Sequence, residues 1–140
     1  MELRSDPRYL AGARELMAAV ARRMGFPESA CSQIALAVDE ALCNVIRHGY
    51  DSATDRPIWL RLWPEAGNGL RIMIEDEAKQ VDPEKIQSRD LEDIRPGGLG
   101  VHIMHEVMDS VEFVRREGGV GMRLTMVKTP AARVGDDRDE

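Results

Sequence analysis

The chain has 140 residues, of which 43% are apolar, which is enough for one domain with an ordinary core over residues 1–134. Its 25 acidic and 19 basic side chains give a net charge of −6 without a basic stripe, which argues against direct nucleic-acid binding. Residues 1–10 lack the apolar segment of a signal peptide, and no run approaches the roughly 18 apolar residues of a membrane span. We therefore expect a cytoplasmic protein with no membrane contact.

The first expected helix begins at Asp6 and Pro7, which are typical of a helix cap and a first-turn proline. Apolar residues then recur at helical spacing, and Gly25 is typical of the residue that closes a helix. The apolar positions are Tyr9, Leu10, Ala13, Leu16, Met17, Val20 and Met24.

A second helix is expected from Pro27 to about residues 48–50. At 100° per residue its apolar side chains form one face. That face consists of Ile34, Val38, Ala41, Leu42, Val45 and Ile46. Cys31 and Cys43 lie on this helix about 18 Å apart by the helical rise, too far for a disulfide, so we expect free thiols in a reducing compartment.

Polar side chains form a stripe along one flank of that face, because Glu40, Asn44 and His48 follow at i, i+4 and i+8. Any amphipathic helix has polar positions, but asparagine is a mediocre helix former. A carboxylate one turn from a carboxamide is also a plausible corner for Mg²⁺, which takes few protein ligands. The stripe therefore indicates a helix that faces a nucleotide.

Two strands are expected next, at residues 58–63 and 70–76, because apolar and polar residues alternate there around a glycine-rich turn. Residues 77–96 are mostly charged and predict a long loop with one short helix near 83–87; we place a lid at about 77–98. A third helix over residues 101–108 and a closing hairpin at 111–126 follow. Residues 135–140 predict a disordered, mainly acidic tail.

This order predicts an α+β fold: a two-layer α/β sandwich with helices on one face of a mixed, mainly antiparallel sheet. Two further features point to a pocket in it. Asp76 ends a strand, where it is either a solvated acid or an acceptor for an amine. The run Gly97, Gly98, Leu99, Gly100 precedes a helix, where it is either a hinge or a phosphate cradle. His102 and His105 could form a metal pair, but nothing of zinc spacing accompanies them.

Three segments resemble the motifs of the histidine-kinase-like ATPases, the superfamily with the Bergerat ATP-binding fold that includes gyrase. The N box is matched by residues 40–48 (EALCNVIRH), the G1 box by 76–83 (DEAKQVDP), and the G2 box by 97–100 (GGLG) with 101–109. The short form of the chain, with residues 44–50 (NVIRHGY) and 108–111 (MDSV), is most similar to bacterial anti-sigma-factor serine/threonine kinases.

This resemblance implies binding of ATP with Mg²⁺. Asn44 would ligate the metal, and Asp76 would hold the adenine amino group. Glu40 would be the general base or polarise the attacking hydroxyl. The remaining residues that it assigns to the nucleotide are His48, Ala78, Gly97, Gly98, Leu99 and Gly100. It also implies a sigma factor and a small protein antagonist as partners, with serine or threonine phosphorylation of the antagonist, and a homodimer.

The sequence departs from the family pattern at Ala78, where a glycine is usual, and at Gln80, where a glycine or proline is usual. A β-carbon where the backbone must approach closely could weaken nucleotide binding. The alternative is therefore a catalytically weak or inactive module of the same fold that binds its partner. A sensor histidine kinase ranks below both, because no helix with a phosphoacceptor histidine precedes the domain in this sequence.

Overall fold

A computed structural model describes residues 1–87 and 99–130. Its sheet has the strand order β1-β2-β3-β5-β4, and every neighbouring pair is antiparallel. The strands are β1 (Glu2–Arg4), β2 (Pro57–Glu65), β3 (Gly69–Asp76), β4 (Ser110–Arg115) and β5 (Met122–Lys128). The expected mixed pairing is absent from this sheet because β5 lies between β3 and β4 and runs antiparallel to both.

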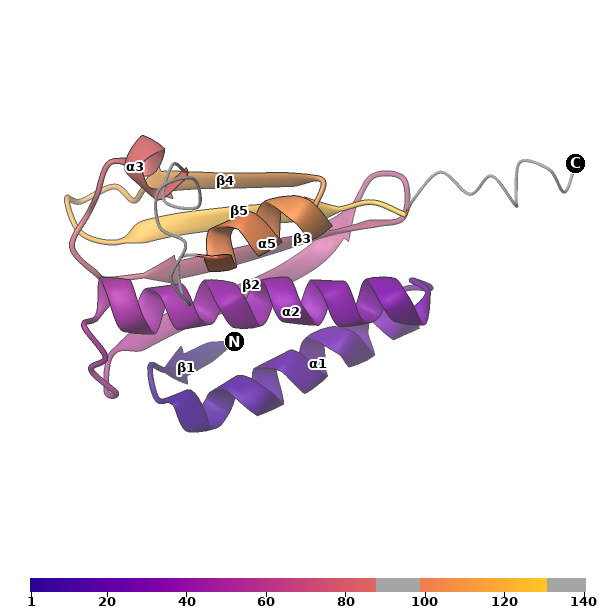
Figure 1. Cartoon of the computed structure of the whole chain (residues 1–140), viewed down its shortest axis with the longest axis horizontal. Coiled ribbons are helices and arrows are strands. Elements are labelled where there is room, and N and C mark those ends of the chain that lie inside the picture. Colours follow the sequence, from indigo (N-terminus) through magenta and orange to yellow (C-terminus); the bar gives the residue numbers. More distant parts are fainter. Residues whose placement is uncertain (88–98, 131–140) are drawn as a thin grey trace, which may run out of the picture.

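Three helices cover one face of the sheet, with α2 lying between α1 and α5 (Figure 1). They are α1 (Leu10–Arg23), α2 (Glu28–Asn44) and α5 (Leu99–Val107); a 3₁₀ turn, η1 (Pro7–Tyr9), precedes α1, and α3 (Pro83–Gln87) follows β3. This arrangement confirms the two-layer sandwich. The expected cap is also present, since the N–H of Arg8 donates to the Asp6 carboxylate at 2.9 Å.

The centre of the core is α2, whose apolar face packs on the sheet and both neighbouring helices. Five of the six residues expected on that face are buried, and Val45 is half-buried. The segment Glu28–Gly49 is long and apolar enough, by length and composition, to cross a membrane, yet half of it is buried inside the fold. Its apolar character is therefore explained by its position as the core helix.

The end of α2 widens into one π-helical turn, η2 (Val45–Gly49), in which the N–H of Tyr50 donates to the Val45 carbonyl. The hydroxyl of Tyr50 then donates to the Pro57 carbonyl at 2.6 Å and accepts the N–H of Glu77 at 2.7 Å. One buried side chain thus ties the end of this helix to the start of β2 and the end of β3.

The expected helices, strands and short helix near residues 83–87 are present, but β1 was not expected. Its three residues are too few and too charged for a period-2 pattern, and they become a strand only by pairing with β2. Gly97, Gly98 and the acidic tail at 135–140 lie outside the described residues, as does the lid from residue 88 onward.

Candidate functional site

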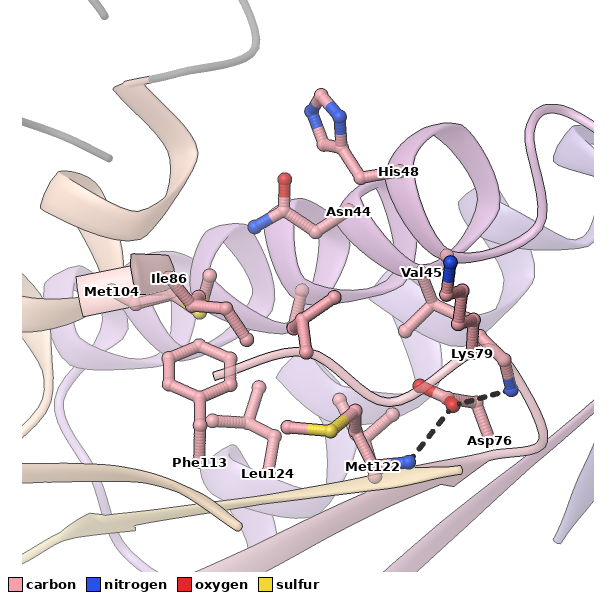
Figure 2. A pocket seen from close by; sticks show the side chains of 15 residues that line it. Asn44, Val45, His48, Asp76, Lys79, Ile86, Met104, Phe113, Met122 and Leu124 are labelled. Atoms are coloured by element: carbon pink, nitrogen blue, oxygen red, sulfur yellow. Dashed lines mark hydrogen bonds between the residues drawn. The ribbon is translucent and has the colours of Figure 1, made fainter. Parts of the chain in front are cut away.

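A pocket that is partly open to solvent lies between the end of α2 and the sheet. Its lining comes from five parts of the fold: α2 with η2, β3 with the segment that follows it, α3, α5, and the β4–β5 hairpin (Figure 2). The polar side chains in the lining are Asn44, His48, Asp76 and Lys79.

Asn44 lies on the α2 side of this pocket, and its Nδ2 is buried without a hydrogen-bond partner among the described residues. An unpaired buried amide costs free energy that a ligand can recover. The other atom of the carboxamide is an oxygen of the kind that Mg²⁺ accepts. Asn44 is therefore placed to contact a polar ligand or its metal ion.

Asp76 lies on the opposite side of the pocket, and only 5% of its surface is exposed. Its Oδ1 accepts the N–H of Ala78 at 2.9 Å and that of Met122 at 3.1 Å. Figure 2 shows both bonds meeting at one oxygen, while the second oxygen points toward the pocket. The carboxylate is thus held by the backbone and presents one free acceptor.

Burial raises the pKa of Asp76 above its ordinary value, although the two N–H donors and the Arg116 guanidinium act in the opposite direction. A buried carboxylate that opens into a pocket is a typical binding group. The ionised form of Asp76 is the stronger acceptor for a ligand amine, because a bound proton would occupy a lone pair of the free oxygen.

Ala78 lines the pocket and is buried beside Gly49. A β-carbon built at Gly49 would lie 3.0 Å from that of Ala78, so the missing side chain at position 49 provides the space that the Ala78 methyl fills. The methyl therefore fits without displacing Asp76, since the N–H of Ala78 still reaches the carboxylate.

The other predicted site residues are placed as follows. His48 is exposed at the rim and, in Figure 2, projects from the same side of the helix as Asn44. Glu40 is half-buried one turn before Asn44 and does not line the pocket in the described part of the chain. Leu99 and Gly100 begin α5, and Gly97 with Gly98 lies outside the description.

Several lining residues were missed by the sequence analysis, among them Lys79, Ile86, Met104, Phe113 and Met122. Met122 could have been found from strand register, because Glu75 pairs with Arg123 and Met122 therefore lies beside Asp76. The apolar members looked like ordinary core residues in the sequence. Together these apolar side chains form an apolar wall of the pocket, on which a flat ring can lie.

A bound group with an amine at one end and anionic oxygens at the other would match this pocket. Asp76 would accept the amine, the apolar wall would hold a ring, and Asn44 would face the anionic end. No group of three His, Cys, Asp or Glu residues is placed to hold a metal within residues 1–87 and 99–130. Mg²⁺ that arrives with a phosphate ligand needs only one or two protein ligands, and Asn44 fits that role.

Comparison with known proteins points to the same fold. Residues 3–128 match the family model of the histidine kinase-like ATPase domain. The serine-protein kinase RsbW of Oceanobacillus iheyensis is 27% identical over 99% of this chain and 92% of its own length. That of Bacillus cereus is 28% identical over 91% of this chain and 82% of its own.

Solved structures agree on the architecture. The mycobacterial sensor histidine kinase MprB has a TM-score of 0.58 at 15% identity, over 93% of this chain and 98% of that one. The histidine kinase domain of the blue-light activated histidine kinase from Erythrobacter litoralis EL346 has a TM-score of 0.56 at 19% identity, over 96% of this chain and 65% of that one. With the family match spanning nearly the whole chain, this protein belongs to the histidine kinase-like ATPase domain family.

Proposed function

We propose that this protein binds ATP with Mg²⁺ in the described pocket and is a serine/threonine kinase of the anti-sigma-factor type. The observation that carries the proposal is the convergence of Asn44 and Asp76, from α2 and β3, on one pocket. Asp76 binds the adenine amine and Asn44 ligates Mg²⁺, while His48, Ala78 and the stretch of residues 97–100 contact the nucleotide. The similarity to proteins named serine-protein kinases supports the choice of reaction.

In this proposal the hydroxyl oxygen of a serine or threonine attacks the γ-phosphorus, the bond to the bridging oxygen breaks, and ADP leaves. Glu40 takes the hydroxyl proton. Because Glu40 is half-exposed outside the pocket, a hydroxyl carried by a protein substrate can approach it from solvent. The substrate is a small protein antagonist, and the kinase also binds a sigma factor in the cytoplasm and thereby regulates transcription.

We also propose a homodimer formed at the open edge of β2. Strand β1 covers β2 only from Pro57 to Trp59, and the described residues include no strand that pairs beyond Leu60. Exposed Met1, Leu16 and Trp63 flank this edge. A two-fold axis at Trp63 would set Arg61 opposite the partner's Glu65, which is a complementary charge pair. Sedimentation should show a dimer, and Leu16→Glu should shift it to the monomer.

A second candidate is a module that binds its partner without phosphoryl transfer. The specific observations that favour it are Ala78 and Gln80 in the G1 segment and the position of Glu40 outside the lining. In support of the kinase, the Ala78 methyl occupies space left by Gly49.

Titration calorimetry with ATP and Mg²⁺, followed by transfer of labelled γ-phosphate to a candidate antagonist, separates the two functions. Binding with transfer to serine or threonine is expected for the kinase. Binding without transfer supports the module, and the absence of nucleotide binding contradicts the proposed site altogether.

A further inference from the structure

The segment after Asp76 is bound to the turn that joins β4 and β5. The N–H of Gly121 donates to the Ala78 carbonyl at 2.8 Å, and the Arg116 guanidinium donates to the Asp76 carbonyl at 2.7 Å. The Gln80 side chain adds two bonds, from its Nε2 to the carbonyls of Arg116 at 2.7 Å and Gly121 at 3.1 Å. The turn is therefore held to the segment that carries the pocket residues Asp76 and Ala78.

Gln80 contacts the two residues that close this turn, Arg116 and Gly121, which we call its neck. The N–H of Arg116 donates to the Gly121 carbonyl at 3.0 Å, so these two residues close the turn, and the Gln80 amide contacts the carbonyls of both. Met122 follows Gly121 directly, and its N–H is one of the two donors to Oδ1 of Asp76. Any movement of Gly121 thus moves a donor that orients the carboxylate.

We propose that Gln80 is a positioning residue for base recognition: by holding the neck of the β4–β5 turn, it keeps the N–H of Met122 on Oδ1 of Asp76 and leaves Oδ2 aimed at the purine amine. This inference rests on the proposed function, because it concerns the same pocket. It gives a purpose to a residue at which the chain departs from the family pattern.

Gln80 can be changed without releasing the turn, because Arg116 tethers it independently. The Arg116 guanidinium lies 3.6 Å from the buried Glu75 carboxylate and stacks over the Trp59 ring at 5.1 Å. Loss of the Gln80 bonds should therefore loosen the neck locally, at Gly121 and Met122, while the hairpin remains attached to β3.

The test uses two variants and a matched control. Gln80→Met keeps the length of the side chain without a charge and cannot donate to the two carbonyls. Gln80→Lys restores a donor and should recover part of the effect. Gln33→Met makes the same change on the exposed side of α2, far along the chain from the G1 segment, and should behave as wild type.

The readout is the ratio of affinities, measured by calorimetry with Mg²⁺, for ADP and for purine riboside diphosphate, which lacks the 6-amino group. A hydrogen bond to a carboxylate should make wild type favour ADP by roughly 10- to 100-fold. Gln80→Met should bring this ratio close to one and leave the affinity for purine riboside diphosphate unchanged. A merely structural role would weaken both ligands equally.

The outcomes separate this inference from the proposed function. If wild type favours ADP and Gln80→Met keeps that preference, or loses affinity for both ligands equally, Gln80 does not position Asp76 and the inference is wrong. If wild type binds neither nucleotide, the proposed function fails and the inference fails with it.

Discussion

Replacement of Asn44 by alanine should make the free protein more stable while abolishing its response to nucleotide. The Nδ2 of Asn44 is buried without a partner in the described part of the chain, and such a group costs about 1–3 kcal/mol. Alanine is also the better helix former by about 0.5 kcal/mol at this position in the continuous helix α2–η2.

Allowing for lost side-chain contacts, we expect a net gain of about 1–3 kcal/mol, which corresponds to a rise in Tm of roughly 3–8 °C. Wild type should instead gain about 4.1 kcal/mol from Mg²⁺-ADP at roughly a thousand times its Kd, and the variant should gain nothing. The order of stability of the two proteins should therefore reverse when nucleotide is added.

Thermal denaturation with and without Mg²⁺-ADP measures this reversal. Ser32→Ala, at an exposed position of the same helix, is the control for helix propensity alone and should still respond to nucleotide. An Asn44→Ala protein that is less stable than wild type without ligand would show that Asn44 has a structural role. One that ADP stabilises as strongly as wild type would refute the assignment of Asn44 to the nucleotide.

Three further predictions concern the proposed site and the residues that support it. Because burial raises the pKa of Asp76, its protonated form contributes stability that is present below pH 3.8 and is lost as the pH rises through the raised pKa. Asp76→Asn should flatten this pH dependence of the unfolding free energy in denaturant titrations, and it should lose affinity for ADP in calorimetry. Gly121→Ala would place a β-carbon 2.2 Å from the Asp76 carbonyl and should lower the free energy of unfolding in urea by about 2 kcal/mol or more. The control Gly118→Ala, also at positive φ but in open space, should lower it only by the smaller penalty of the backbone conformation. Glu40→Gln should preserve ATP binding and lower phosphoryl transfer by about 10²-fold or more, and unchanged transfer would remove Glu40 from catalysis.

Much of the fold could be predicted because long periodic patterns dominate it. Apolar residues recur at helical spacing over many turns of α2, and the apolar residues that alternate in β2 and β3 lie opposite one another in the strand register. Strand β1 could not be predicted, since its three residues depend on β2 for their structure. The π-helical turn at Val45–Gly49 was missed for a similar reason, because the Tyr50 hydroxyl that anchors its end bonds to distant segments.

Of the polar residues that line the candidate pocket, Asn44, His48 and Asp76 were predicted and Lys79 was not, and the apolar lining was missed apart from Ala78. Asn44 was noticeable because its side chain is unfavourable in a helix, and Asp76 because it ends a strand. Met104 and Met122 carry no such signal, since a methionine that contacts a ligand looks like a core residue in sequence. The fit of Ala78 depends on Gly49, a neighbour in space that the sequence gives no means of pairing with it.

The most direct test of the account is methyl NMR of ¹³C-labelled methionine during titration with Mg²⁺-ATP. Met104 and Met122 line the pocket, whereas Met17 is buried in α1 and Met73 lies on β3 facing away from the helices. We expect the Met104 and Met122 methyl signals to shift and those of Met17 and Met73 to stay. Unchanged Met104 and Met122 signals, or shifts confined to Met73, would contradict a nucleotide site between α2 and the sheet.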